Sequence, residues 1–300
     1  MLFRKHWALA TAALVVGCAP AEQATPAMAI DVADVGFATP ESVLDDTVAD
    51  VYLVSNINGQ PTDKDDNGFI SRLAPTGTVE SLKWIDGATD AVTLNAPKGS
   101  TIRNDTLFVA DIDAVRLFDR RTGAPLGDWP VPGATFLNDL AVGPDGTLYV
   151  TDTGVSAGEG GLVPNGSDAV YRREGDHWTA IVSGAGLGNP NGIIADSNGV
   201  TVVGYGSGDV YRLDPATGKR TMLPKPPEGG LDGIVELPDG TFLISSWNGQ
   251  GVYRSSPSGQ YTKAVTDSVA APADIGYDFK RHVLLIPDFM GNRVLIRPVH

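Results

Sequence analysis

Six copies of one segment recur along the chain, and this repeat constrains the fold more than any other feature of the sequence. Each copy opens with a Pro or Leu that has a polar side chain one or two positions later, and a tight turn and an apolar, β-rich run follow. The copies begin at positions 40, 97, 137, 190, 231 and 272. A repeat of about 40 to 50 residues with several short strands is typical of β-propeller blades. The sequence therefore predicts an all-β chain folded as a six-bladed β-propeller.

The apolar runs predict the second strand of each blade, and a third run follows every one of them. The six apolar runs are 51–55, 107–111, 148–152, 200–204, 242–246 and 282–288. The last repeat reaches His300 before any fourth strand, whereas the segment 30–35 precedes the first repeat. Because an open ring would expose two unpaired sheet edges, we expect segment 30–35 to supply the missing outer strand of the last blade and to close the ring.

Composition agrees with one β-domain and argues against some partners. The 300 residues include 36 Gly and 21 Pro, and no long stretch has a helical period. The formal net charge of −14 argues against binding to nucleic acid or to an anionic surface, since both need basic patches. We therefore expect a small-molecule substrate and no nucleic-acid partner.

The N-terminus carries a separate signal. Arg4 and Lys5 precede an apolar stretch, residues 7–17, that is too short to span a bilayer as a stable helix. The stretch ends in Val-Val-Gly-Cys, and this Cys18 is the only cysteine of the chain. The junction resembles a bacterial lipobox, which implies that Cys18 is lipidated and becomes the first mature residue. An ordinary cleaved secretory signal is the alternative.

This interpretation divides the chain into three parts: a signal peptide (1–17), the lipidated Cys18 with a tether (18–29), and the propeller (30–300). It predicts a protein of the bacterial cell envelope that meets the membrane through its lipid anchor only. Ala19 after the cysteine resembles the sorting signal for the outer membrane, so the periplasmic face of that membrane is the expected location.

The long insertions fall on one face of the predicted ring. In an antiparallel meander the first and third strands run in the same direction, so the loop that enters strand one and the loop between strands two and three share a face. The insertions 56–68 and 153–168 occupy the second of these loops in the first and third repeats. Long loops on a rigid scaffold usually carry binding function. We therefore expect this face, called the working face below, to carry the site.

Two motifs within these insertions have ordinary interpretations. The segment 63–68 matches the first half of an EF-hand loop, D-x-D-x-N-G, but Ala74 stands where the bidentate Glu of such a loop belongs. We interpret it as an acidic, solvated loop, with a second cation site as the alternative. The glycine-rich segment 158–161 is interpreted as a flexible loop.

A ring of polar residues is predicted where the innermost strands begin. Its members, one from each repeat, are Glu41, Lys98, Asn138, Asn191, Asp232 and Asp274. Carboxylate and amide oxygens are the hard ligands that calcium selects, and four such ligands would leave coordination positions for water and substrate. Bound water at the mouth of the channel, or simple turn formation at Asn-Gly and Asp-Gly, is the alternative explanation.

The motifs of this ring resemble those of a known family. Glu41, Asn138-Asp139, Pro190-Asn191-Gly192 and Leu231-Asp232-Gly233 resemble the metal-site motifs of the senescence-marker-protein/gluconolactonase family of six-bladed propellers. The resemblance implies that Glu41, Asn138, Asn191 and Asp232 bind one divalent cation, most often calcium. It also implies a hydrolase that opens lactones or cleaves phosphotriesters, with Asp232 as the catalytic residue that activates water. A carboxylate bound to a cation is, however, a poor base on electrostatic grounds.

Four further residues are candidates for substrate contacts. Lys98 and Asp274 belong to the ring, and Trp247 and Phe289 follow second strands on the working face. For Lys98 the alternative is an ion pair with Glu41 or Asp274, and for the aromatic residues it is ordinary packing.

The sequence also departs from the family pattern. The first motif reads Pro40-Glu41-Ser42-Val43, and a histidine pair like that of the paraoxonase relatives is not recognisable. The substrate class therefore stays open, and two functions remain. One is a calcium-dependent hydrolase of lactones or related esters, and the other is a non-catalytic propeller lipoprotein that binds a ligand or a partner.

Overall fold

A computed structural model of the chain describes Met1 and residues 29–299. Apart from Met1, the predicted signal peptide lies outside the described residues, and so does Cys18, the predicted lipidation site. In the part of the chain that the structure covers, no helix has the length and hydrophobicity needed to cross a membrane.

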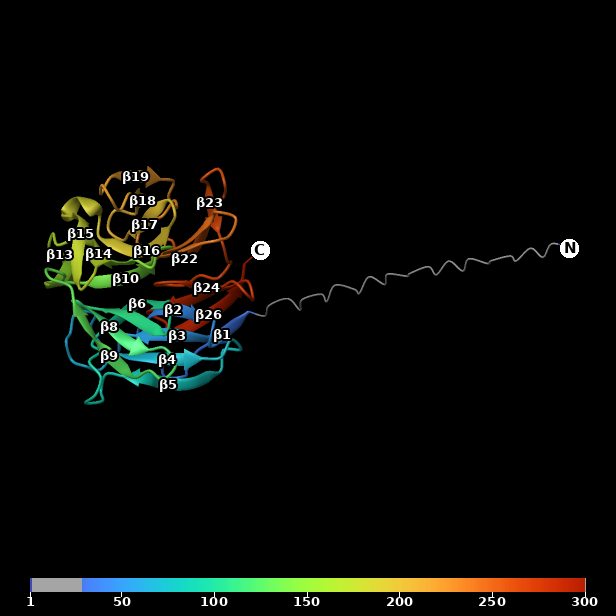
Figure 1. Cartoon of the computed structure of the whole chain (residues 1–300), viewed down its shortest axis with the longest axis horizontal. Coiled ribbons are helices and arrows are strands. Elements are labelled where there is room, and N and C mark those ends of the chain that lie inside the picture. The colour runs from blue at the N-terminus through green and yellow to red at the C-terminus, as the bar shows by residue number, and fades with distance from the viewer. Residues whose placement is uncertain (2–28, 300) are drawn as a thin grey trace.

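The described chain forms six four-stranded antiparallel sheets arranged around a central axis, which confirms the predicted six-bladed propeller (Figure 1). Blades one to three contain, from the inside outward, β2 (Pro40–Asp46), β3 (Val51–Asn56), β4 (Phe69–Leu73) and β5 (Val79–Asp86); β6 (Pro97–Arg103), β7 (Thr106–Asp111), β8 (Ala114–Asp119) and β9 (Pro125–Pro130); and β10 (Leu137–Val142), β11 (Leu148–Asp152), β14 (Ala169–Glu174) and β15 (His177–Ser183).

Blades four to six contain β16 (Pro190–Asp196), β17 (Gly199–Gly204), β18 (Val210–Leu213) and β19 (Arg220–Leu223); β20 (Leu231–Glu236), β21 (Phe242–Ser246), β22 (Gly251–Ser255) and β23 (Tyr261–Lys263); and β24 (Gly276–Asp278), β25 (Val283–Asp288), β26 (Arg293–Pro298) and β1 (Ile30–Val32). A short 3-10 helix, Ala185–Leu187, precedes blade four. Each innermost strand contacts the next around the ring, and β24 contacts β2, so the ring is closed.

The N-terminal strand closes the ring as predicted. β1 pairs antiparallel with β26, and Ile30 lies opposite Ile296 while Val32 lies opposite Val294. Val32 is buried, and Arg297 donates a hydrogen bond of 2.8 Å to the carbonyl oxygen of Ile30. The last blade thus takes its outermost strand from the opposite end of the described chain, and the outer edge of β26 is paired.

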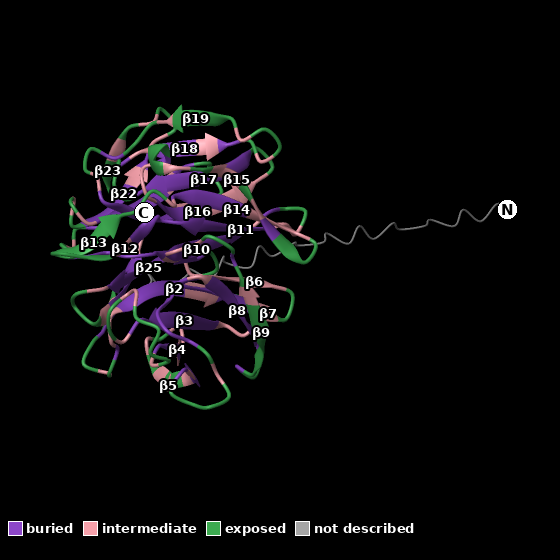
Figure 2. Ribbon diagram, turned by 90° about the vertical axis from the view of Figure 1, so that its left-hand side faces the viewer, coloured by how far each residue is buried: buried purple, intermediate pink, exposed green. Residues whose placement is uncertain are grey.

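The hydrophobic core lies between the blades. Buried apolar side chains form one cluster at each interface between neighbouring blades, and Figure 2 shows the buried residues concentrated in the inner strands. Between blades two and three, for example, Phe108 and Val115 pack with Leu137 and Val150. Every sheet is covered on both sides by its neighbouring blades. The inner strands therefore carry apolar side chains on both of their faces.

The insertion of blade three differs from its prediction. We expected segment 158–161 to be a flexible loop, whereas it contains the turn of a hairpin formed by β12 (Val155–Gly158) and β13 (Gly161–Pro164). Gly160 and Gly161 have φ values of 87° and 128°, and this positive φ is what lets the chain reverse there. The hairpin is exposed apart from its first residues.

Candidate metal centre

Backbone irregularities position the ring residues. The pairing of the innermost with the second strand shifts register directly after the first residue of the inner strand in blades one to five, between Pro40 and Ser42, Pro97 and Ser100, Leu137 and Leu140, Pro190 and Ile193, and Leu231 and Ile234. A bulge of this kind releases one or two residues from the ladder and re-aims their side chains. Glu41, Asn138, Asn191 and Asp232 are among the residues released.

Four oxygen atoms of this ring are buried and have no partner. Nine buried side-chain nitrogen or oxygen atoms in the described part of the chain lack a hydrogen bond, and four of the nine are Glu41 Oε2, Asn138 Oδ1, Asn191 Oδ1 and Asp232 Oδ1. The four side chains are only 3–5% exposed. Buried polar atoms are nearly always satisfied in folded proteins, so the four oxygens at equivalent positions of four blades are available to accept from a bound water or to bind a cation.

The other polar atoms of two ring residues are anchored by the protein. Asn138 donates through Nδ2 to Thr153 Oγ1 at 3.0 Å, which leaves its Oδ1 as the free atom. Trp247 donates through Nε1 to Asp232 Oδ2 at 2.8 Å, which leaves Asp232 Oδ1 free. In both residues the protein binds one end of the planar group and leaves an oxygen acceptor for something else.

The electrostatics of the ring favour a cation. Burial raises the pKa of Glu41 well above its usual value, and the nearby carboxylates of Asp232, Asp274 and Asp139 raise it further, whereas Lys98 lowers it. Burial and Asp274 likewise raise the pKa of Asp232. Buried carboxylates that repel one another are costly when ionised, and a divalent cation at this point would offset that cost.

The donor set fits a hard divalent cation such as Ca²⁺. It consists of two carboxylate and two amide oxygens, and water or substrate oxygens would complete the coordination shell of the cation. The described residues contain no grouping of three or more His, Cys, Asp or Glu side chains suited to a metal, so this ring depends on its two asparagines. The absence of nitrogen and sulfur donors makes the ring a poor match for zinc.

One member of the predicted ring was misplaced by one residue. Pro272 pairs with Asp288 as Pro40 pairs with Asn56, so the counterpart of Glu41 in blade six is Ala273, and the prediction that Asp274 occupies this level is wrong. Asp274 lies one position further along the channel, where it accepts a hydrogen bond of 2.6 Å from Ser42 Oγ. Its proposed contact with substrate stays a prediction.

Lys98 does not form the ion pair with Glu41 or Asp274 that was the alternative prediction for it. Its Nζ donates to the carbonyl oxygens of Ala96 at 3.0 Å and Pro61 at 3.1 Å, and it lies 4.2 Å from the centre of the Phe136 ring. Among the described residues no ion pair joins Lys98 to Glu41 or Asp274. Burial lowers the pKa of Lys98 to about 8, against the opposing influence of Glu41. Through Pro61, Lys98 ties the first insertion to the ring.

An aromatic row stands beside the ring on the working face. Trp247 lies between Tyr205 and Phe289, with ring centres 5.6 Å and 5.3 Å apart. The three residues follow the second strands of blades four, five and six. The sequence indicated Trp247 and Phe289, which the structure places together, but missed Tyr205. The signal for Tyr205 was its position directly after the run 200–204, equivalent to that of Trp247.

The acidic segment of the first insertion is occupied by the protein's own donors. Asp65 accepts a hydrogen bond of 2.6 Å from Asn67, Asp66 accepts one of 3.2 Å from the backbone of Leu94, and Lys64 forms an ion pair with Asp113. The arrangement agrees with the interpretation as an acidic loop, and a second cation site stays the alternative prediction.

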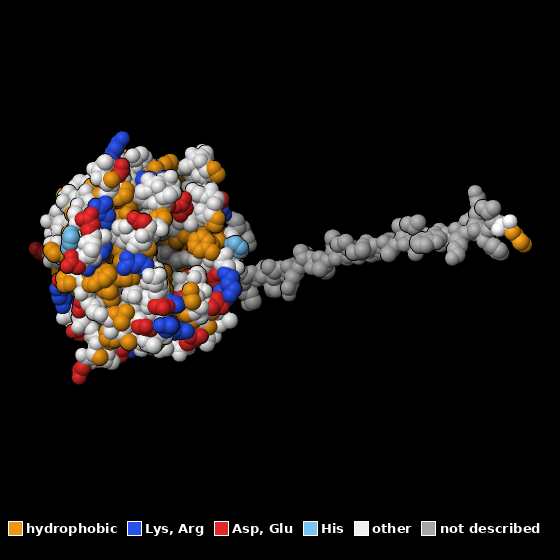
Figure 3. All heavy atoms as spheres, viewed as in Figure 1, with side chains coloured by type: hydrophobic (Ala, Val, Ile, Leu, Met, Phe, Trp, Pro, Cys, Tyr) orange, Lys and Arg blue, Asp and Glu red, His pale blue; other side chains and the backbone are white. Residues whose placement is uncertain are grey.

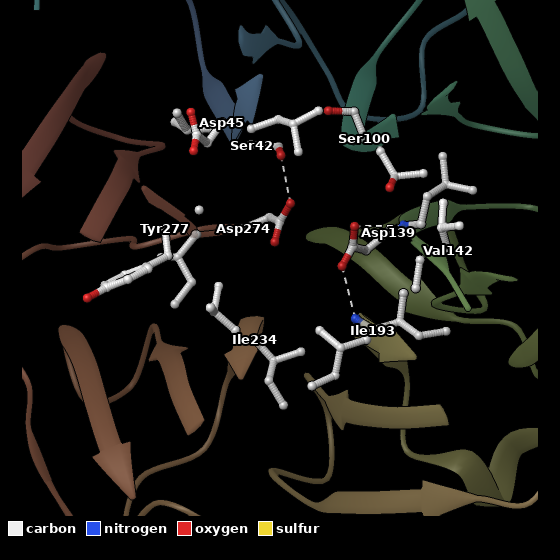
Figure 4. Close-up of a pocket in the computed structure, with 18 of the residues that line it drawn as sticks. Ser42, Asp45, Ser100, Asp139, Val142, Ile193, Ile234, Asp274 and Tyr277 are labelled. Atoms are coloured by element: carbon white, nitrogen blue, oxygen red, sulfur yellow. Dashed lines mark hydrogen bonds between the residues drawn. The ribbon is translucent and has the colours of Figure 1, made fainter. Parts of the chain in front are cut away.

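A cavity of about 330 Å³ occupies the central channel on the side opposite the working face (Figure 4). Its inner end is lined by Ser42, Asp139 and Asp274, and its outer end by Thr47 and Phe279, which lie in the tight turns of that side. Ser42 and Asp139 directly follow Glu41 and Asn138 along the chain, so the channel reaches the level directly below the ring. Figure 3 shows one face of the molecule, hollowed near its centre, with apolar side chains beside the hollow and charges of both signs around it.

Gly192 is expected to be essential for the spacing of the ring. A Cβ atom at this position would lie 2.2 Å from the carbonyl oxygen of Asp232, so the inner strands of blades four and five approach too closely for any side chain. We expect Gly192→Ala to lower the free energy of unfolding by about 2–3 kcal/mol, measured by chemical denaturation. Gly186→Ala is the matched control, since a Cβ atom at that position would have no heavy atom within 4 Å. Equal stability of the two variants would contradict the close approach.

The fold and the ring define a class of protein: a six-bladed propeller with an oxygen-lined centre at the start of its inner strands. The chain belongs to the SMP-30/Gluconolactonase/LRE-like family, whose model matches residues 70–277. Asn138, Asn191 and Asp232 lie within the matched segment, and Glu41 precedes it. No curated protein sequence matches the chain.

Several solved structures share the fold. A gluconolactonase from Xanthomonas campestris superposes with a TM-score of 0.67 at 20% identity, over 91% of this chain and 89% of that one. A putative gluconolactonase superposes with a TM-score of 0.64 at 17% identity, over 91% of this chain and 93% of that one. A streptogramin B lyase superposes with a TM-score of 0.62 at 11% identity, over 90% of this chain and 98% of that one. At such identities the likeness establishes the fold only, and its occurrence in both a lactonase and a lyase means that the reaction must be argued from the site.

Proposed function

We propose that this protein is a divalent-metal-dependent hydrolase of lactones or related esters, with calcium as the preferred metal. The observation that carries the proposal is the set of four buried, unpartnered oxygens of Glu41, Asn138, Asn191 and Asp232. Membership of the gluconolactonase family supports the reaction class.

In this proposal the four ring residues hold the metal through Glu41 Oε2, Asn138 Oδ1, Asn191 Oδ1 and Asp232 Oδ1. When bound, the metal supplies Lewis-acid polarisation of the substrate's carbonyl oxygen. The protein fixes the ligands beforehand through the bulges of the inner strands and through the hydrogen bonds of Asn138 and Asp232. Such preorganisation limits the rearrangement needed when substrate binds.

Asp232 is the candidate base that accepts a proton from the attacking water. Burial and the neighbouring Asp274 raise the pKa of its carboxyl group, which favours proton uptake, whereas a bound cation acts in the opposite direction. The two carboxylate oxygens of Asp232 differ in their contacts. Oδ2 accepts the hydrogen bond from Trp247, and Oδ1 has no hydrogen-bond partner.

The substrate is proposed to lie on the working face. Trp247 and Phe289 would contact its apolar part, and Lys98 and Asp274 are candidates for its polar part. The protein is further proposed to act in the cell envelope, anchored through Cys18, since its N-terminal motif resembles a lipobox.

The test is hydrolysis of a panel of lactones and aryl esters by the 19–300 fragment, which contains the whole described propeller. We expect turnover that chelator abolishes and calcium restores, and a loss of at least about 100-fold in kcat/KM in Asp232→Ala. Asp176→Ala removes a fully exposed carboxylate and is the matched control. A folded, metal-loaded protein without turnover on any substrate would instead favour the non-catalytic binding propeller.

A further inference from the structure

The indole ring of Trp247 is held in place from several directions. Its ring packs edge-to-face against Tyr205, with an interplanar angle of 84°, and at 53° against Phe289. Its backbone N–H donates to the carbonyl oxygen of Gly230 at 2.9 Å. Gly230 has a φ of 63°, a conformation that favours glycine, and a Cβ there would lie 3.2 Å from Cβ of Trp247, so the two residues approach each other closely. Three blades therefore fix the orientation of one side chain.

The indole of Trp247 carries a single hydrogen-bond donor, and this donor points at Asp232, one of the proposed metal ligands. The Nε1–H group of Trp247 lies 2.8 Å from Asp232 Oδ2, whereas Asp232 Oδ1 is buried and has no partner. Because a carboxylate is planar and tryptophan has only one hydrogen-bond donor in its side chain, holding Oδ2 also determines where Oδ1 can point.

We infer that Trp247 is a positioning residue for the metal centre: its indole N–H orients Asp232 so that Oδ1 is presented to the cation. The inference rests on the proposed metal site, and it assigns Trp247 a role distinct from contact with substrate. Donors that fix a metal-binding side chain typically change metal affinity by about 10- to 100-fold when they are removed.

The chain offers a closely matched pair of substitutions to test this inference. Trp247→Phe keeps an aromatic ring between Tyr205 and Phe289 but removes the N–H donor. Trp178→Phe makes the same change at a buried tryptophan in β15, the outermost strand of blade three, whose Nε1 has no hydrogen-bond partner. Both variants lose the same atoms, but only the first loses a hydrogen bond to a proposed ligand.

The measurement is calcium binding by isothermal titration calorimetry to the folded 19–300 protein, with the melting temperature of the chelated protein recorded in parallel. We expect the Kd for Ca²⁺ to rise roughly tenfold or more in Trp247→Phe and to stay within twofold in Trp178→Phe. Terbium luminescence excited through tryptophan tests separately where the metal lies: because Trp247 adjoins a proposed ligand, the signal should be lost in Trp247→Phe, which removes the sensitising indole, and kept in Trp178→Phe.

The outcomes separate the metal site from the role of Trp247. If wild-type protein binds neither Ca²⁺ nor Tb³⁺, the proposed metal site fails and the inference falls with it. If wild-type protein binds and Trp247→Phe binds equally well, the metal site stands and the role of Trp247 is refuted. A loss of affinity in both variants, in step with their melting temperatures, would show general destabilisation and would also refute it.

Discussion

A chain that begins at residue 34 is expected to melt far below one that begins at residue 29. The longer fragment keeps β1, whereas the shorter one exposes the edge of β26 and loses the pairing of Ile30–Val32 with Val294–Ile296. Burial of Val32 contributes about 1.5–2 kcal/mol, and each lost hydrogen bond of the edge about 1 kcal/mol. We expect a total loss of about 3–5 kcal/mol and a fall in melting temperature of roughly 10 °C.

Other contacts of β1 add to this loss. Arg297 would lose its hydrogen bonds to the carbonyl of Ile30 and the carboxylate of Asp31. The turn at Gly77 packs directly on Ile30 and Val32. Differential scanning calorimetry of the two fragments checks the prediction, and size-exclusion chromatography should show self-association of the shorter one through its exposed edge. Equal melting temperatures would mean that β1 is a dispensable addition to a ring held by inter-blade packing.

The closure of the ring could be predicted because it follows from counting. Each repeat contributes up to four strands, and the last repeat ends before its fourth, so the segment 30–35 was the available partner. The hairpin β12–β13 could not be predicted in the same way. Its strands are four residues each and are mostly exposed, so no apolar alternation marks them.

The four residues proposed as metal ligands could be predicted from motif resemblance, but the geometry of their ring could not. The sequence indicated Glu41, Asn138, Asn191 and Asp232, and the structure leaves an oxygen of each buried and unpartnered. The error at Asp274 arose because strand pairing sets the level at which a residue lies in the channel. A polar residue two positions after the repeat's proline therefore lies at a different level from a polar residue directly after that proline. Bulges depend on pairing with a second strand, and a local pattern does not reveal them.

The buried charge of Glu41 is expected to affect stability in opposite directions with and without metal. Glu41 is buried among the carboxylates of Asp232, Asp274 and Asp139, which raise its pKa, and Lys98 is the cation that lowers it. Without metal, an ionised carboxylate at this position destabilises the fold. With calcium, the same carboxylate is a proposed ligand, and binding at a calcium concentration of 100 Kd would stabilise the folded state by about 2.7 kcal/mol.

We therefore expect Glu41→Gln to raise the melting temperature of the chelated protein and to lower that of the calcium-treated protein, relative to wild type. Gln keeps the size and one oxygen acceptor of Glu but removes the charge, so the gain without metal should be roughly 1 kcal/mol and the loss with calcium larger. The experiment is a thermal melt at pH 8 with chelator and with calcium, with Glu159→Gln in the exposed hairpin as the control that changes neither. If Glu41→Gln shifted both melts in the same direction, the carboxylate would be acting through packing, and the assignment of Glu41 as a metal ligand would have to be abandoned.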